Sequence, residues 1–400
     1  MNQEKEYIYI PDYALAVMNE LRESGEEVYI VGGCVRDALL GLEPHDYDMT
    51  VSCPPERTLE ILAKFRTIPT GLQHGTVTAI SKGNPIELTT FRIDGRYTDM
   101  RRPDSVSFAS SLCDDLSRRD FTVNAMAYSP ESSLVDLFGG RDDLKRGILR
   151  AVGEPKKRFS EDALRIMRAF RFSSQLGFDI EENTLRAAHE CKDGLKSIAA
   201  ERIRAEFLRL LCGKVPEAPL RLMKELDILR FVSREYAPSD RIISLIPQMP
   251  NDASARLGFY FCETARELAS AIIGGLRCSN KEKSSALAVV SGARKSINTP
   301  YDVRLLRAQF GENARTVLCA SVLLGNSDAD SLSLLDKECS PSTLGELAIN
   351  GQDILALGFR GKDIGNTMEY LLSEVIKAPS LNTKEALISI ASNKLKEKEE

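Results

Sequence analysis

Residues 29–51 read Tyr29-Ile-Val-Gly-Gly-Cys-Val-Arg-Asp-Ala-Leu-Leu-Gly-Leu-Glu-Pro-His-Asp-Tyr-Asp-Met-Thr-Val51. The pattern predicts an apolar strand, a double-glycine turn, a short helix over residues 34–40 and a second strand over residues 46–51. Glycine lets the backbone approach an anion, and the free N–H groups at a helix start favour negative charge. Gly32 and Gly33 therefore indicate a phosphate cradle, although a purely structural tight turn would use the same residues.

Charged residues follow the two glycines at a spacing that suits a nucleotide. Arg36 falls in the first helical turn, where its forked guanidinium can reach the same phosphates. Asp46 and Asp48 would project from one face of a strand, because side chains alternate along it. Mg²⁺ prefers a few carboxylates completed by phosphate oxygens and water. The stretch therefore predicts metal-dependent nucleotidyl transfer at a two-metal site, with Asp46 and Asp48 as the ligands. The alternative is a solvated strand end.

A third carboxylate is needed to orient a metal or to accept the proton of an attacking hydroxyl. Glu87 is the best candidate, because the predicted strand over residues 86–91 places apolar Ile86 and Leu88 on the opposite face from it. The alternative is an exposed glutamate on an edge strand.

Composition restricts the classes of protein that the chain can belong to. The 400 residues carry 53 Lys and Arg against 58 Asp and Glu, and the net charge is −5. This balance excludes a generally basic nucleic-acid coat but not a local basic face. No apolar run is long enough to span a bilayer, and the polar N-terminus is no signal peptide. Nine scattered cysteines without a CxxC pair favour a reduced, cytoplasmic compartment, with most of them buried as small hydrophobes.

The order of predicted elements divides the chain into a mixed part and a helical part. A helix over residues 11–24 opens the chain, strand signals recur up to residue 108, and helical periodicity dominates from Ser160 onward. We therefore predict an α+β head with a mixed sheet over residues 1–150, followed by an all-α neck (151–214), body (215–340) and tail (341–400).

Several motifs resemble one family in order, the class II tRNA nucleotidyltransferases, which include the bacterial CCA-adding enzymes. They lie at residues 31–51, 70–78, 94–103, 116–127 and 158–172, with a weaker resemblance over residues 347–358. The resemblance implies a nucleotidyltransferase head and sequential addition of C, C and A to tRNA 3′ ends from CTP and ATP, with Mg²⁺ and without a nucleic-acid template. Between residues 216 and 340 little is familiar.

The residues around 160 suggest how a protein could replace a template. Asp162 can accept a hydrogen bond from the exocyclic amine of cytosine or adenine, and Arg165 can donate to the neighbouring ring nitrogen. Uracil and guanine present a carbonyl beside a ring N–H, so Asp162 would face another acceptor and Arg165 another donor. The spacing places Glu161, Asp162 and Arg165 within one helical turn that Ser160 would cap. The alternative is an intrahelical salt bridge between Asp162 and Arg165.

The resemblance also implies roles for neighbouring residues. It assigns Arg168 and Arg171 to contacts with the nucleotide or its phosphates, although a solvated basic face would show the same spacing. It places an arginine at the nucleotide in the motif around residue 119, and we prefer Arg119 over Arg118. A further set of residues would support the site: Glu161 the base-reading pair, Asp120 and Asn124 the loop geometry, and Glu201, Arg202 and Glu206 the base-reading helix.

Two further features bear on the acceptor. Residues 155–214 carry 13 Lys and Arg against 9 Asp and Glu, a net charge of +4 that would attract RNA phosphates. The loop over residues 94–103, with Arg96, Tyr97 and Arg101, resembles the family's flexible loop, which is implicated in the change from C to A addition. We expect tRNA to be bound through its acceptor and T arms, and we expect no appended phosphohydrolase. An A-only tRNA enzyme, a bacterial poly(A) polymerase with the same head, and a catalytically dead RNA-binding scaffold stay open as alternatives.

Overall fold

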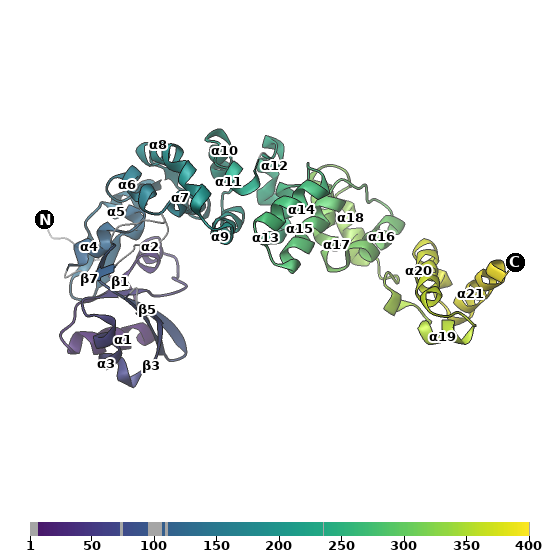
Figure 1. Ribbon diagram of the computed structural model, residues 1–400, viewed down its shortest axis with the longest axis horizontal. Coiled ribbons are helices and arrows are strands. Elements are labelled where there is room, and N and C mark those ends of the chain that lie inside the picture. Colours follow the sequence, from purple (N-terminus) through teal and green to yellow (C-terminus); the bar gives the residue numbers. More distant parts are fainter. Residues whose placement is uncertain (1–6, 73–74, 95–105, 109–110, 235, 400) are drawn as a thin grey trace. The chain divides into compact units, whose positions relative to one another are not determined.

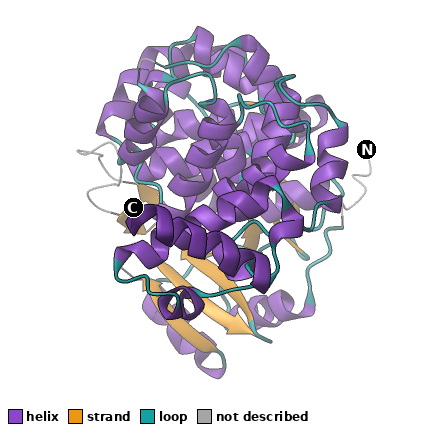
Figure 2. Ribbon diagram, turned by 90° about the vertical axis from the view of Figure 1, so that its right-hand side faces the viewer, coloured by secondary structure: helices purple, strands orange, loops and turns teal. Residues whose placement is uncertain are grey.

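A computed structural model describes residues 7–72, 75–94, 106–108, 111–234 and 236–399. The chain forms two compact units, residues 1–237 and 238–400, which are described separately. The predicted fold class is confirmed: strands and helices alternate in the first part of the chain, and helices follow (Figures 1 and 2).

The first unit carries all the strands of the described chain, and its helices and strands have the following bounds. The helices are α1 (Asp12–Glu23), α2 (Gly33–Leu39), α3 (Pro55–Ile61), α4 (Leu112–Ser117), α5 (Gly140–Arg146), α6 (Pro155–Glu161), α7 (Leu164–Leu176), α8 (Glu182–Cys191), α9 (Ala200–Leu211), α10 (Glu217–Glu225) and α11 (Arg230–Ser233), with 3₁₀ turns at η1 (Leu62–Lys64), η3 (Thr122–Asn124) and η4 (Lys192–Ser197). The strands are β1 (Val28–Val31), β2 (Met49–Val51), β3 (Arg66–Gly71), β4 (Thr76–Ser81), β5 (Asn84–Thr90), β6 (Arg92–Asp94), β7 (Val106–Phe108), β8 (Met126–Ser129), β9 (Ser133–Asp136), β10 (Ile148–Leu149) and β11 (Asp179–Ile180).

The central sheet has seven strands in the order β3-β4-β5-β2-β1-β8-β9. Only β2 and β5 pair in parallel within it, with Met49 opposite Leu88. Every other pair in this sheet is antiparallel. Strands β3, β8 and β9 are absent from the sequence prediction, because their mixed polar composition lacks a clear alternation. β2 also begins three residues later than predicted, at Met49.

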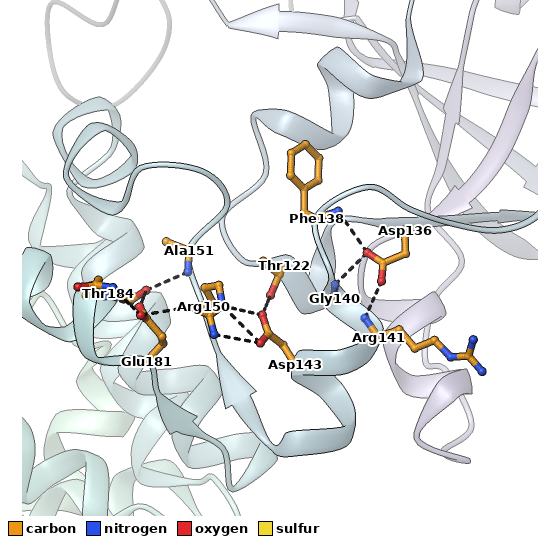
Figure 3. A network of polar contacts seen from close by, with 11 residues as sticks. Thr122, Asp136, Phe138, Gly140, Arg141, Asp143, Arg150, Ala151, Glu181 and Thr184 are labelled. Carbon is orange, nitrogen blue, oxygen red and sulfur yellow. Dashed lines mark hydrogen bonds and ion pairs between the residues drawn. The ribbon is translucent and has the colours of Figure 1, made fainter.

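Polar contacts join the end of the sheet to the helices that follow it (Figure 3). Asp143 of α5 accepts hydrogen bonds from Thr122 Oγ1 at 2.8 Å and from Arg150 Nε at 3.0 Å. Arg150 also lies 3.3 Å from Glu181, the residue that caps α8 by accepting from the Thr184 backbone N–H. These bonds fix the position of the helical neck relative to the sheet within the first unit.

The second unit is helical throughout its described residues. Its helices are α12 (Asp240–Leu245), α13 (Ala253–Tyr260), α14 (Arg266–Gly275), α15 (Asn280–Gly292), α16 (Pro300–Phe310), α17 (Ala314–Leu323), α18 (Asp330–Lys337), α19 (Gly351–Ala356), α20 (Lys362–Lys377) and α21 (Lys384–Glu399), with 3₁₀ turns at η5 (Ile246–Gln248), η6 (Gly311–Asn313), η7 (Leu344–Glu346) and η8 (Pro379–Leu381). Buried side chains between Leu347 and Ala391 form a hydrophobic cluster of their own. That cluster lies within the segment predicted as a tail.

The structure bears on two predictions from composition, the burial of the cysteines and the absence of a membrane-spanning segment. All nine cysteines are free, but only Cys34, Cys53 and Cys262 are buried, so the prediction that most are buried was wrong. The others lie on helices or turns that are partly open to solvent. No helix among the described residues is both long and apolar enough to cross a membrane.

Candidate nucleotide-binding and catalytic site

The double-glycine turn lies between β1 and α2, as predicted. Gly32 has a φ of +76°, and a Cβ built on it would lie 3.1 Å from Arg119 Nη1. A Cβ on Gly33 would lie 3.7 Å from Arg36 Nη2. Both guanidinium groups therefore lie against the turn, and the positive φ and close approach of Arg119 require glycine at position 32, whereas a Cβ on Gly33 would make an ordinary contact.

Asp46 and Asp48 lie in the extended segment that leads into β2, not on the strand itself as predicted. The alternation nevertheless begins before the strand, because Tyr47 and Met49 are buried while both aspartates are exposed. The reason is that the segment is already paired with β1: the Val31 N–H donates to the Asp48 carbonyl at 3.0 Å. The inference that the two carboxylates share a face is consistent with this alternation.

Glu87 lies beside this pair. The parallel register of β2 and β5 sets Met49 opposite Leu88, which brings Asp48 next to Glu87. Glu87 is exposed between buried Ile86 and Leu88, as predicted. Desolvation by the surrounding protein, with repulsion from Asp46 and Glu87, raises the pKa of Asp48 to about 6, although Arg119 opposes the rise. Asp46 and Glu87 thus both act on Asp48, beside the central strands β2 and β5 of the sheet.

The donor set fits a hard cation. Carboxylate oxygens that repel one another, and whose ionisation is disfavoured, gain from a divalent ion between them. Among the described residues, no three acidic, histidine or cysteine side chains are arranged to hold a metal without further ligands. A magnesium ion at Asp46 and Asp48 would therefore depend on phosphate oxygens and water to complete its coordination, which is the usual arrangement for Mg²⁺.

Asp115, on α4, orients the two arginines of the next motif and was missed in the sequence. Its fully buried carboxylate accepts from Arg118 Nη2 at 2.6 Å and from Arg119 Nη2 at 3.2 Å. Burial alone would raise the pKa of Asp115, but the two guanidinium groups outweigh burial and lower it. The spacing of three and four residues was a readable helical signal. Arg119 Nε is buried and has no hydrogen-bond partner among the described residues, so it can still receive an anion.

Asp120 and Asn124, predicted to hold the loop geometry, are joined by hydrogen bonds to each other and to their neighbours. Asp120 accepts from the Phe121 backbone N–H at 2.8 Å and from the Asn124 amide at 3.2 Å. The Asn124 carbonyl oxygen then accepts from Arg36 Nη1 at 2.6 Å. Arg168 donates to Asp120 from Nε at 2.8 Å. Burial would raise the pKa of Asp120, but Arg168 outweighs it and holds the pKa at about 2.

The residues predicted to read the base lie at a break between two helices, and this corrects the predicted helical turn. Helix α6 ends at Glu161, Asp162 is extended with a φ of −138°, and α7 begins at Leu164. Ser160 therefore lies inside α6 and donates to the Lys156 carbonyl, so its predicted role as an N-cap was wrong. Asp162 itself accepts from the Leu164 backbone N–H at 3.0 Å, so its carboxylate satisfies the N–H of the first residue of α7.

Arg165 and Asp162 have separate partners. Arg165 donates from Nη1 to Glu161 at 2.9 Å and to the Arg158 carbonyl at 3.0 Å, and from Nη2 to the Arg118 carbonyl at 2.9 Å. Asp162 Oδ2 lies 3.3 Å from Arg202 Nη2 on α9. The two side chains thus remain separate groups, one donating and one accepting, and Glu161 supports Arg165 as predicted.

Arg171 lies deeper than the predicted basic face. It is 7% exposed, and its Nε lies 2.5 Å from Glu206 Oε2 on α9. With the contact between Arg202 and Asp162, this pair braces α7 against α9, as predicted for these α9 residues. The predicted loop residues Arg96, Tyr97 and Arg101 lie outside the described residues.

Comparison with known proteins identifies the family. A Poly A polymerase head domain matches residues 28–150, and a domain described as the probable RNA and SrmB-binding site of polymerase A matches residues 177–239. The CCA-adding enzyme of Ligilactobacillus salivarius (strain UCC118) is 36% identical over 403 residues, 97% of this chain and 98% of that protein. The CCA-adding enzyme of Limosilactobacillus fermentum is 36% identical over 389 residues, 96% of this chain and 97% of that protein. The chain belongs to the CCA-adding enzymes.

A solved structure supports the same assignment. The crystal structure of the Bacillus stearothermophilus CCA-adding enzyme in complex with CTP matches with a TM-score of 0.81 at 29% identity, over 97% of this chain and 98% of that chain. The predicted family and enzyme class are thereby confirmed. The similarity to CCA-adding enzymes also runs through residues 216–340, where no motif was visible in the sequence.

Proposed function

We propose that this CCA-adding enzyme adds C, C and A in turn to the 3′ end of tRNA, using CTP and ATP and releasing pyrophosphate. The observation that carries the proposal is the turn at Gly32 and Gly33, against which Arg36 and Arg119 lie beside the carboxylates of Asp46 and Asp48. The CTP bound by the Bacillus stearothermophilus relative supports the choice of nucleotide. A cytoplasmic location, as the composition predicts, would place the enzyme with its tRNA.

The triphosphate would lie on the double-glycine turn. Two guanidinium groups and the backbone N–H groups at the start of α2 would neutralise its charge. Arg119 retains an unpartnered Nε for this purpose, and Asp115 prevents it from turning away. Asp46 and Asp48 would hold Mg²⁺, which when bound supplies charge neutralisation at the reacting phosphate.

Glu87 is our candidate for the group that accepts the proton of the tRNA 3′-hydroxyl. That hydroxyl attacks the α-phosphate, a new phosphodiester bond forms, and pyrophosphate leaves. Glu87 lies next to Asp48 and its side chain is exposed, so its carboxylate can reach an incoming hydroxyl as a general base must. Substitution of Glu87 by Gln should then lower kcat without weakening nucleotide binding.

Asp162 and Arg165 would select the base. Arg165 uses three N–H groups on Glu161 and two carbonyl oxygens, which leaves Nε–H and one Nη2–H to donate to a ring nitrogen. Asp162 would accept from the exocyclic amine. A base with the opposite pattern leaves buried groups unpaired, at a cost of about 1–3 kcal/mol for each. For Arg165→Ala we expect a lower rate and a loss of selectivity against UTP and GTP. Intact selectivity in this variant would contradict the assignment.

The acceptor would be bound along the helical neck (151–214), body (215–340) and tail (341–400), the divisions that we retain as a proposal. Residues 155–214 of the neck carry a net charge of +4, in the same unit as the nucleotide site. Positive charge there would hold RNA phosphates near the reaction, and such binding weakens as the salt concentration rises.

Incubation with three tRNA transcripts tests the proposal. The transcripts end before CCA, after C and after CC, and each receives Mg²⁺ with CTP, ATP or both. Extension of all three to CCA, followed by a stop, is the expected result. Extension of the CC-ending transcript alone would identify an A-only enzyme, and an adenosine ladder would identify a poly(A) polymerase. Binding without incorporation would identify a scaffold.

A further inference from the structure

Phe172, near the end of α7, is surrounded by three arginines. The guanidinium carbon of Arg171 lies 3.8 Å from the centre of the ring, that of Arg168 lies 5.3 Å away, and that of Arg36 lies 5.4 Å away. All three distances fall within the range in which a cation is attracted by the π electrons of a ring. The ring is 7% exposed, so water weakens this attraction little.

These arginines come from different parts of the first unit. Arg36 belongs to α2 beside the phosphate turn, whereas Arg168 and Arg171 belong to α7, which also carries Arg165. Each arginine also has polar anchors: Arg36 on Asn124 and Asp37, Arg168 on Asp120, and Arg171 on Glu206 and Gln175. Asn124 also bonds to Asp120, so Arg36 and Arg168 are linked on two sides, by the ring and by this polar chain.

The ring itself is held by a neighbour. Phe121 meets Phe172 edge-on, with ring centres 5.8 Å apart and planes at 80°. Like charges repel, so guanidinium groups gathered this closely need compensation from carboxylates and from the negative face of a ring. The polar partners hold one side of each guanidinium group. The ring supplies a common surface that fixes the distance between Arg36 and Arg168.

We propose that Phe172 is a positioning residue for the nucleotide. From α7, the helix that reads the base, its ring holds Arg36 in the position that binds the triphosphate. The inference rests on the proposed function, because Arg36 is assigned to the phosphates there. It predicts a definite pattern. Loss of the ring loosens Arg36. Because Arg36 is assigned to the triphosphate, which CTP and ATP share, both nucleotides should lose affinity by the same factor.

The base-reading contacts would not change. Arg165 is held by Glu161 and by two backbone carbonyls, and Asp162 by Leu164 and Arg202, none of which involves the ring. Selectivity for CTP over UTP should therefore stay constant while affinity falls. A general loosening of the fold would not produce this combination.

The test is the full chain carrying Phe172→Leu, with Phe170→Leu as the matched control. Phe170 lies two residues away on α7 and is fully buried, and among the described residues no cation lies over its ring. Calorimetric Kd values for CTP and ATP with Mg²⁺ should rise about tenfold for Phe172→Leu, as expected for the loss of contacts of this kind. They should stay near the original values for Phe170→Leu. Phe172→Tyr, which keeps the π face, should restore both.

Each remaining outcome decides the question. Unaltered Kd values in Phe172→Leu, an equal rise in Phe170→Leu, or a rise for only one of the two nucleotides would overturn the proposal. If Phe172→Leu does not fold, Phe172→Met replaces it and carries the same expectation. Binding of both nucleotides by the unaltered chain without tRNA extension would contradict the proposed function alone, and failure to bind either nucleotide would overturn both.

Discussion

Asp48 occupies a position where its carboxylate is costly to ionise without a cation. Desolvation, with repulsion from Asp46 and Glu87, raises its pKa to about 6. The folded chain therefore binds a proton there more tightly than the unfolded chain does. It follows that the free energy of unfolding falls as the pH rises from about 4 to about 6, and that the penalty is fully present above pH 6.

Asp48→Asn removes this penalty along with the metal ligand. In EDTA at pH 8 the variant should unfold at a higher temperature than the unaltered chain, and the difference should shrink as the pH falls through 6. Nucleotide incorporation should fall by more than the roughly 10- to 100-fold that loss of an outer-shell partner of a metal costs. Thermal unfolding followed at several pH values, with incorporation assayed in parallel, checks both. A variant that is less stable at pH 8 would show that the folded chain does not penalise the ionised carboxylate of Asp48.

Gly32 and Gly41 are two glycines with similar backbone angles but different surroundings, so their alanine variants can be compared. Both have positive φ, +76° and +72°, but a Cβ on Gly32 would meet Arg119, whereas one on Gly41 would meet no atom within 4 Å. Alanine at either position should reduce the free energy of unfolding by about 1–3 kcal/mol, because its backbone rarely adopts such angles. Only Gly32→Ala should also weaken CTP binding, by displacing Arg119. Equal CTP affinity in the two variants, measured by calorimetry, would contradict the placement of Arg119.

Among the elements, α7 carries most of the contacts that organise the site. Its N-terminal side meets the Arg118 carbonyl through Arg165, and its C-terminal side meets α9 through Arg171 and Glu206. Both members of the latter pair are nearly fully buried. A buried ion pair is weak support for stability as a whole, but the loss of one partner leaves a buried charge alone.

Glu206→Gln should therefore reduce the free energy of unfolding by about 3–5 kcal/mol. The double variant Arg171→Met with Glu206→Leu should lose much less, because no charge remains buried. Urea unfolding measures both changes. The exposed pair of Arg186 and Glu182 on α8 is the control, and Glu182→Gln should change stability by less than about 0.5 kcal/mol. A double variant as unstable as the single one would contradict this account.

On the scale of the whole molecule, every residue assigned to the nucleotide lies in the first unit. The Gly-Gly turn, the carboxylates, the base-reading pair and Phe172 all precede residue 237, where that unit ends. The matched RNA-binding domain of residues 177–239 also ends close to this boundary. Compact units of this length can fold alone.

Residues 1–237 expressed alone should therefore bind CTP with a Kd similar to that of the full chain. Their affinity for tRNA should fall at least about tenfold, since the helices proposed to hold the acceptor would be missing. Calorimetry with CTP and filter binding with a tRNA transcript measure the two quantities. Full tRNA affinity in the fragment would contradict the proposed role of the body and tail, and a soluble fragment that fails to bind CTP would contradict a nucleotide site confined to the first unit.

The family was recognised from the resemblance of its ordered motifs, whereas short-range order in the chain predicted the turn at Gly32 and Gly33, the shared face of Asp46 and Asp48 and the class of fold. Such features follow from spacings of two, three or four residues, which a strand or helix converts directly into geometry. The same spacing misled at Ser160, because the helix breaks at Asp162, whose side chain binds the Leu164 N–H and Arg202 of α9.

Only the tertiary structure decided the partner of each charge. Arg165 lies 47 residues from Arg118, Arg168 lies 48 from Asp120, and Arg36 lies 88 from Asn124, yet each pair forms a hydrogen bond. No local pattern encodes such contacts, because they depend on which helices pack together after the sheet has formed. Phe172 had no visible role in the sequence for the same reason, because Arg36 reaches it only through the fold.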